Sequence, residues 1–337
     1  MNVSLISIDL AKNVFQVCGV NREGKQVFNR AVRRAKLAEL IAQHSGTVIA
    51  MEACGGSNYW GRRFEQDGHE VRLIPPIQVK PFVKGNKNDR NDAFAISEAA
   101  RRPNVSIVPP RTVEQTDLIL AHRIRDRRVK SRTALINQAR GLLGEYGIVV
   151  APGPAALRAA LPLLLEDAGN ALTPMARHYL HSVLEEWRAL EQHIDDIDQA
   201  IKVTARSLPA VRCLLDIQGV GCMIATAMVA KLGRGLQFRS GRQFSASLGL
   251  VPCEHSSGGK QRLGGISRRG DHYLRRLLIQ GAWSVIRYAD TREDRLSRWA
   301  RELVQRRGKH KAVIAVANKL ARIIWAMVRY ERDYQAM

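Results

Sequence analysis

Two acidic residues stand three positions apart in the stretch KGNKNDRNDAFAI, which covers residues 84–96. Asp89 and Asp92 lie where an apolar helical pattern begins, and cationic or amide side chains surround them. A spacing of three places both carboxylates on the same side of a helix. One interpretation is a solvated helix start, where acids favour the positive end of the helix dipole. A catalytic interpretation requires further carboxylates from other parts of the chain.

Asp9 and Glu52 are the candidates, because each ends a β-rich segment, VSLISID (3–9) and TVIAMEA (47–53). Carboxylates held close together raise one another's pKa unless a divalent cation compensates their charge. Their hard oxygen ligands suit Mg²⁺ or Mn²⁺. Two such ions can stabilise the attacking and leaving oxygens of a phosphoryl transfer. We therefore predict that Asp9, Glu52, Asp89 and Asp92 are catalytic and bind Mg²⁺ or Mn²⁺.

The elements that must position these acids follow the order β-β-β-α-β-α-β-α, a mixed α/β pattern. Three antiparallel strands followed by alternating helices and strands is the order of a ribonuclease-H-like sheet. Its first and fourth strands lie side by side, so the ends that carry Asp9 and Glu52 converge. The helix that opens with Asp89 and Asp92 follows the fifth strand. The predicted strands are 3–9, 13–20, 26–32, 47–53 and 69–75, and the predicted helices before Asp89 are 33–44 and 57–68.

Charge is the strongest global feature: 53 Lys and Arg against 31 Asp and Glu give a net charge of +22. Such a field attracts polyanions, and nucleic acid is the commonest of these. Lys84, Lys87 and Arg90 would hold a phosphate backbone next to the acids. An anionic membrane is the alternative, but no stretch approaches the roughly 20 apolar residues needed to span one.

The start MNVSLISIDLAK has no basic segment before its apolar residues, so we predict no secretory signal. Five scattered cysteines without a CxxC pattern fit reduced thiols and a cytoplasmic location better than disulfides or a zinc site. His178 and His181 have the i, i+3 spacing but lack further ligand types nearby, which argues against a metal site there.

The residue pattern in the middle of the chain predicts two long helices. The first covers residues 112–147, and its centre, from Arg123 to Arg132, is dense in cations that form either a solvated face or a phosphate-facing one. APGPAA (151–156) breaks the pattern, and the second helix follows over 176–201. Its apolar residues repeat at alternating three and four positions, as in a coiled coil, which predicts packing in a hairpin or between subunits.

In the last third, Gly219-Val220-Gly221 separates two helical segments. This resembles a helix-hairpin-helix, whose backbone N–H groups bind phosphate without reading sequence. The alternative is that the two glycines end a helix for steric reasons.

A basic, glycine-rich loop follows, with Ser256 and Ser257 directly before Gly258 and Gly259. Residues 255–337 hold 19 Lys and Arg against 7 Asp and Glu. An electropositive setting of this kind suits a nucleophilic serine that attacks a phosphate, although a serine in such a loop is often only a loop residue. The candidate phosphate ligands in and after this loop are Lys260, Arg262, Arg268 and Arg269.

Four segments together resemble the IS110/IS1111 family of insertion-sequence transposases: IDLAK (8–12), MEACGGSNYWGRRF (51–64), KNDRNDAFAI (87–96) and the run from IQGVGCMIATA to GDHYLRRLL. The resemblance covers nearly the whole chain. It implies a RuvC-like N-terminal domain with an Asp-Glu-Asp-Asp set on Asp9, Glu52, Asp89 and Asp92. It also implies a catalytic serine in a Pro-x(4)-Ser-Gly context, which falls on Ser257, with Ser256 as the neighbouring alternative. The family further implies a structured RNA, encoded by the element, that pairs with donor and target DNA.

We therefore expect three domains: a RuvC-like catalytic domain (1–111), a helical coiled-coil region (112–205) and a mainly helical transposase domain with the serine loop (206–337). The expected activity is Mg²⁺-dependent recombination of double-stranded DNA through a phosphoserine intermediate, by a homo-dimer or tetramer. Three alternatives stay open: a RuvC-like nuclease that hydrolyses branched DNA, a kinase-like or actin-like ATPase, and a non-catalytic helix-hairpin-helix DNA-binding protein. The charge of +22 argues against the ATPase.

Overall fold

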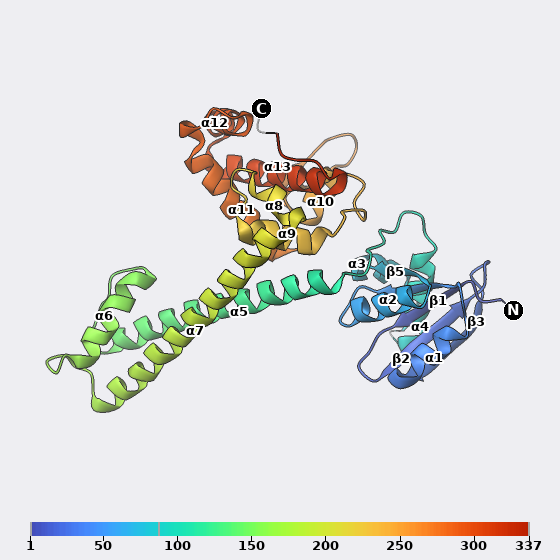
Figure 1. Ribbon diagram of the computed structural model, residues 1–337, viewed down its shortest axis with the longest axis horizontal. Coiled ribbons are helices and arrows are strands. Elements are labelled where there is room, and N and C mark those ends of the chain that lie inside the picture. Colours follow the sequence, from blue (N-terminus) through green and yellow to red (C-terminus); the bar gives the residue numbers. More distant parts are fainter. Residues whose placement is uncertain (1, 87, 336–337) are drawn as a thin grey trace. The chain divides into compact units, whose positions relative to one another are not determined.

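The computed structural model describes residues 2–86 and 88–335, and the chain divides into two compact units (Figure 1). Unit 1 comprises Met1–Thr116 and Gly233–Phe244, and unit 2 comprises Asp117–Leu232 and Ser245–Met337. Lys87, a predicted phosphate ligand, lies outside the described residues.

Unit 1 contains a five-stranded mixed sheet in the order β3-β2-β1-β4-β5. β1 pairs with β4, and β4 with β5, in parallel, whereas the β1–β2 and β2–β3 pairs are antiparallel. The predicted meander and the predicted neighbourhood of the first and fourth strands are therefore confirmed. The strands are β1 (Leu5–Asp9), β2 (Val14–Val20), β3 (Gln26–Arg33), β4 (Val48–Glu52) and β5 (Glu70–Ile74).

Helices cover both faces of this sheet, because apolar residues on β1 and β4 alternate between the two faces. Ile6, Ile8, Ile49 and Met51 pack with α1 (Leu37–Ala42) and α2 (Ser57–Gln66). Leu5, Ala50 and Ile74 pack on the other face with α4 (Asp89–Ala100). Short helical turns lie beside these elements: η1 (Arg34–Lys36), α3 (Pro76–Val79) and η2 (Lys80–Phe82).

Two long helices, α5 (Val113–Glu145) and α7 (Pro174–Ser207), confirm the two that the sequence predicts. The apolar stripe of α7 is buried along its length and includes Leu180, Leu184, Trp187, Ile194 and Ile201. Its first part packs with residues of α5 and α6 (Pro154–Glu166). Helix α6 begins at a proline and contains Pro162, and the sequence pattern did not predict it.

The remainder of unit 2 is mainly helical, with α11 and α12 packed along α13. Among the described residues, no helix is long and apolar enough to cross a membrane. The elements are α8 (Pro209–Leu215), α9 (Cys222–Leu232), α10 (Gly241–Ser247), β6 (Pro252–Glu254), β7 (Leu263–Ile266), α11 (His272–Arg287), η3 (Ala289–Thr291), α12 (Arg295–Arg307) and α13 (Lys309–Tyr330).

Candidate active site and nucleic-acid contacts

Asp9 and Glu52 lie at the same edge of the sheet. β1 and β4 pair in parallel with Ile8 opposite Met51, so the next residue of each strand is an acid. Both carboxylates are half-buried, whereas the isoleucine and the methionine before them are fully buried in the core. The core thus fixes the two strand ends and leaves the acids facing partly into solvent.

The first turn of α4 lies beside β1. The side chain of Asn88 caps the helix by accepting a hydrogen bond of 2.9 Å from the N–H of Asn91. The buried hydroxyl of Ser7 in β1 donates a hydrogen bond of 2.6 Å to the carbonyl oxygen of Ala93. This contact holds the residue after Asp92 against the strand that ends in Asp9.

The effect of one carboxylate on the pKa of another group indicates which acids lie close together. Burial raises the pKa of Glu52, and the nearby carboxylate of Asp92 raises it further. Burial also raises the pKa of the Cys54 thiol, with further contributions from Glu52 and Asp9. Asp9, Glu52 and Asp92 therefore share one negatively charged edge. Asp89 lies one turn before Asp92 on the same helix and is exposed.

The donor chemistry of this edge fits a hard divalent cation, because carboxylate oxygens are the ligands that Mg²⁺ and Mn²⁺ prefer. Within the described part of the chain, however, no three His, Cys, Asp or Glu side chains form a group that could hold a metal ion. The backbone thus brings three acids to one edge, and their side chains are not arranged as a closed ligand set.

Two of the cations predicted to hold phosphate beside the acids can be located. Lys84 is exposed in the segment before α4. The guanidinium of Arg90 donates a hydrogen bond of 3.1 Å to the carbonyl oxygen of Asn29 on β3, and the Asn29 side chain donates one of 3.0 Å to the Arg90 carbonyl. Arg90 therefore also fastens α4 to the sheet.

The segment around Ser257, expected to be a loop, is a β-hairpin. β6 and β7 are antiparallel, and a further bridge pairs Ser257 with Lys260. Gly258 and Gly259 form the two-residue turn with φ of 56° and 74°, the left-handed conformation that such a turn requires and that glycine adopts without strain. This pairing was not predicted, although Gly-Gly between short segments is a hairpin signal.

The two serines of the hairpin differ in their hydrogen bonds. The hydroxyl of Ser256 donates a hydrogen bond of 2.6 Å to the carboxylate of Glu254 and accepts one of 3.1 Å from the N–H of Arg262. The exposed hydroxyl of Ser257 has no hydrogen-bond partner among the described residues. Ser257 is thus the serine whose hydroxyl is available to an external group.

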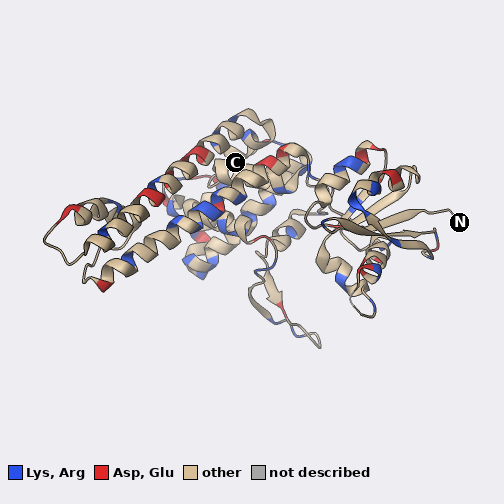
Figure 2. Ribbon diagram, turned by 90° about the horizontal axis from the view of Figure 1, so that it is seen from below, with Lys and Arg blue, Asp and Glu red and all other residues tan. Residues whose placement is uncertain are grey.

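The hairpin is electropositive and extends beyond the helices of unit 2 (Figure 2). Lys260, Arg262, Arg268 and Arg269 are all exposed on it or just after it. Its base is held by Arg275 of α11, a buried residue whose guanidinium donates to the carbonyl oxygens of Leu248 (2.8 Å) and Arg269 (3.0 Å). This role of Arg275 was not predicted; its signal in the sequence is one arginine on the apolar side of HYLRRLL.

Gly219 and Gly221 lie between α8 and α9, as predicted. Gly219 has a φ of 80° and lies so close to Gly281 of α11 that a methyl group on either would collide with the carbonyl oxygen of the other. Gly221 is exposed, with open space where a side chain would be. The first glycine therefore permits close backbone packing, and the second leaves the N-terminus of α9 accessible.

Comparison with known proteins identifies the family. A model of the DEDD type of IS110 transposase, described as "Transposase", matches residues 6–148, and one described as "Transposase IS116/IS110/IS902 family" matches residues 211–298. A "Probable family 20 transposase" from Pseudomonas aeruginosa is 45% identical over 99% of both chains. The "Transposase for insertion sequence element IS1111A" from Coxiella burnetii is 43% identical over 99% of this chain and 92% of its own length. The chain belongs to the IS110/IS1111 family of transposases.

A third relative, the "Transposase for insertion sequence element IS1328" from Yersinia enterocolitica, is 37% identical over 97% of both chains. The names of these relatives and of both family models indicate an insertion-sequence transposase, an enzyme that cleaves and rejoins DNA. In this transposase, the first matched region contains Asp9, Glu52, Asp89 and Asp92, and the second contains Ser257. The roles of these five residues stay predictions.

Proposed function

We propose that this transposase recombines double-stranded DNA at the ends of its insertion sequence through a two-part active site. A carboxylate edge in a RuvC-like, ribonuclease-H-like domain forms one part, and the serine hairpin forms the other. The observation that supports the proposal is the parallel pairing of β1 with β4, which ends the two strands in Asp9 and Glu52, with the turn after Asp92 held against β1 by the Ser7–Ala93 hydrogen bond. Acids held this close to one another favour a bound cation, because a divalent ion offsets their mutual repulsion.

Asp9, Glu52 and Asp92, with Asp89 completing the set, would hold Mg²⁺ or Mn²⁺. When bound, such ions supply Lewis acidity at the oxygens of a phosphoryl transfer. Lys84 and Arg90 would contact the phosphates on either side of the scissile one. The Arg90 contact would need no large rearrangement, because hydrogen bonds to Asn29 already place its backbone and guanidinium beside the start of α4.

Ser257 is the proposed nucleophile. Its Oγ forms a bond to phosphorus while the bond from phosphorus to one DNA oxygen breaks; the serine proton leaves, and the departing DNA oxygen takes up a proton. A DNA hydroxyl later attacks the phosphoserine and releases Ser257, so no energy source is consumed. Lys260, Arg262, Arg268 and Arg269 would neutralise the charge that develops on the phosphate.

The division into domains and their nucleic-acid contacts are part of the same proposal. We infer a catalytic domain over 1–111, a coiled-coil region over 112–205 that assembles a dimer or tetramer, and a transposase domain over 206–337. The α8–α9 hairpin with Gly219 and Gly221 would bind DNA backbone as a helix-hairpin-helix. A structured guide RNA, implied by the family resemblance, would select donor and target DNA. The exposed cations of α5, such as Arg123 and Arg127, suit its phosphates.

A covalent-adduct assay tests the chemistry. Purified protein, element-junction DNA with labelled phosphate, flanking non-coding RNA and Mg²⁺ should yield a protein–DNA adduct. Ser257→Ala should abolish the adduct while DNA binding persists, because only a hydroxyl is removed from an exposed position. Ser256→Ala, the matched control one residue away, should retain adduct formation. An adduct that persists in Ser257→Ala would contradict the assignment, and cleavage without any adduct would favour hydrolysis by a RuvC-like nuclease.

A further inference from the structure

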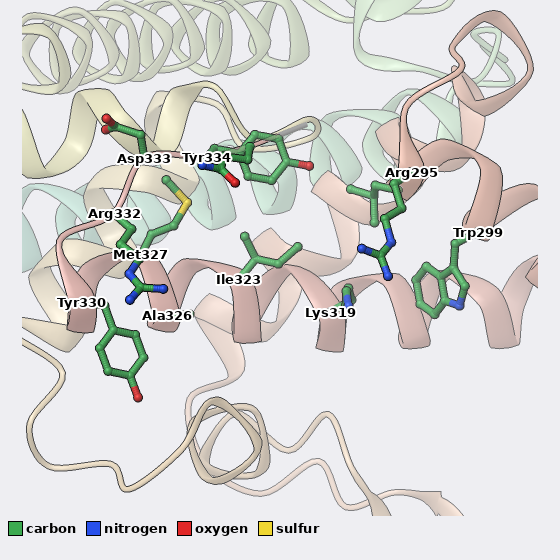
Figure 3. A pocket seen from close by; sticks show the side chains of 12 residues that line it. Arg295, Trp299, Lys319, Ile323, Ala326, Met327, Tyr330, Arg332, Asp333 and Tyr334 are labelled. Atoms are coloured by element: carbon green, nitrogen blue, oxygen red, sulfur yellow. The ribbon is translucent and has the colours of Figure 1, made fainter. Parts of the chain in front are cut away.

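A cavity of about 600 Å³ lies between α12, α13 and the segment that follows α13 (Figure 3). Three aromatic side chains line it: Trp299 of α12, Tyr330 at the end of α13, and Tyr334 beyond it. Apolar side chains of α13, including Ile323 and Met327, complete the lining. The surface inside is therefore apolar and aromatic although the protein is strongly basic.

A chain reversal forms one wall of this cavity. Glu331 has a φ of 51° and a ψ of 46°, a left-handed conformation that is rare for a residue other than glycine. The N–H groups of Glu331 and Arg332 both donate to the carbonyl oxygen of Met327, which ends α13 and turns the chain. In Figure 3, Tyr334 consequently lies on the side of the cavity that faces Ile323.

Cations surround the apolar interior. Arg295, Lys319 and Arg332 line the cavity, against a single acid, Asp333. Figure 3 places Arg295 and Trp299 towards one end and Arg332 and Tyr330 towards the other. Among the described residues, none of the three cations forms a salt bridge. The guanidinium of Arg332 lies 5.7 Å from the ring centre of Tyr330, and that of Arg329 lies 5.9 Å from the same centre.

We propose that this cavity binds one unpaired nucleotide of the nucleic acid on which the transposase acts. Aromatic rings stack on nucleobases irrespective of sequence, and cations beside them hold the flanking phosphates. The volume lies within the range of about 300–1,000 Å³ that is typical of small-molecule sites. A paired base cannot enter, because it is stacked inside its duplex, so the nucleotide must come from a bulge, a loop or a displaced strand. The proposal rests on the proposed action on DNA and RNA.

Fluorescence anisotropy of labelled duplexes, in EDTA to prevent cleavage, tests this site. The probes are a fully paired duplex and the same duplex with a single-nucleotide bulge, each prepared as DNA and as RNA. Wild-type protein should bind the bulged probe about tenfold more tightly, as expected for one stacked base. Preference within the DNA pair or within the RNA pair identifies the natural source of the nucleotide.

Tyr330→Ala should remove the preference without weakening the binding of the paired duplex, since Tyr330 is 57% exposed and contributes little to the core. Trp299→Leu should do the same, because it removes the aromatic ring and keeps an apolar side chain at this position. Tyr288→Ala is the matched control, because Tyr288 is 52% exposed on the same unit and does not line the cavity. Asp92→Asn should keep the preference, so failure of the metal site does not affect this test.

A preference that survives in both cavity variants, or its absence in the wild type, would overturn the proposal. A change of oligomeric state in nucleic-acid-free Tyr330→Ala protein, with the preference intact, would instead assign the cavity to a second copy.

Discussion

The hydroxyl of Ser7 donates a hydrogen bond of 2.6 Å to the carbonyl oxygen of Ala93, and the serine is fully buried. It joins the strand that ends in Asp9 to the helix turn that carries Asp92. This buried polar contact, together with the Arg90–Asn29 hydrogen bonds, therefore positions Asp92 relative to Asp9. A buried carbonyl that loses its donor destabilises the fold, so this contact is both structural and positional.

Ser7→Ala should lower the free energy of unfolding by about 1–2 kcal/mol and reduce DNA cleavage several-fold under conditions where the protein stays folded. Denaturant unfolding and a cleavage assay measure the two effects. Ser97→Ala is the control, since among the described residues the buried hydroxyl of Ser97 bonds within α4, to the carbonyl oxygen of Phe94. Equal losses of cleavage in both variants would mean that stability, and not the position of α4, explains the effect.

Asp92→Asn should abolish metal-dependent cleavage and leave the affinity for DNA or RNA largely unchanged. The amide keeps the shape of the side chain but removes a negative charge and an anionic ligand from the edge. Cleavage assays across a Mg²⁺ titration, paired with filter binding, separate the two properties. Asp67→Asn, at the end of α2, serves as the control for loss of an acid elsewhere. Wild-type cleavage by Asp92→Asn would rule out the carboxylate site.

Mixing Ser257→Ala with Asp92→Asn protein should partly restore recombination if one subunit supplies the serine and another the acids. Each variant alone is expected to be inactive, and some mixed assemblies reunite an intact serine with intact acids. Strand exchange is measured over a range of mixing ratios. Persistent inactivity of the mixture, with assembly on DNA intact, would show that one chain contributes both parts.

The purified transposase should bind structured RNA with an affinity that falls steeply with salt, because each phosphate contact releases counterions. Arg123 and Arg127 are exposed and four residues apart on α5, so they face the same side. Replacing both by alanine should reduce the salt slope by about 2. Recombination activity that is unaffected by nuclease treatment would remove RNA from the mechanism.

The stability of unit 2 should depend on pH through His122. Its Nδ1 lies 2.9 Å from the hydroxyl of Tyr273 and its Nε2 lies 2.9 Å from that of Thr226. The Thr226 hydroxyl donates to the carbonyl oxygen of Cys222, so it accepts from Nε2–H, and Nδ1 accepts from Tyr273. Burial and, to a smaller extent, the nearby Arg125 lower the pKa of His122 to about 4, against an opposing effect of Asp198.

Because the folded pKa lies below the ordinary value of 6.5, the unfolded chain binds more protons between pH 6.5 and 4. The contribution of His122 to the free energy of unfolding is therefore fully present above pH 6.5. It decreases by about 3 kcal/mol as the pH drops towards 4. His122→Gln should flatten that dependence, which chemical denaturation at several pH values can measure. An unchanged pH profile in the variant would contradict the assignment to His122.

The sequence by itself determined the strand order of the sheet in unit 1. Apolar residues that alternate along β1 and β4 must face two cores, and parallel pairing of these strands brings Asp9 and Glu52 to one edge. The start of α4 is also set by nearby residues, because the side chain of Asn88 caps the helix by accepting from the N–H of Asn91, three positions later. The alternation along each strand and the helix cap depend on neighbouring residues, so both can be recognised in the sequence before the chain is folded.

Only the tertiary structure decided how the serine segment is presented. β6 and β7 have three and four residues, mostly exposed and glycine-rich in β7, so no apolar alternation marks them. Their pairing, and the bonds that occupy Ser256 but not Ser257, exist only once the two segments meet. Arg275 is a similar case, since its guanidinium donates to the carbonyl oxygen of Leu248, 27 residues earlier in the chain. Long-range hydrogen bonds of this kind leave little trace in local sequence, because any chain with suitable backbone groups can accept them.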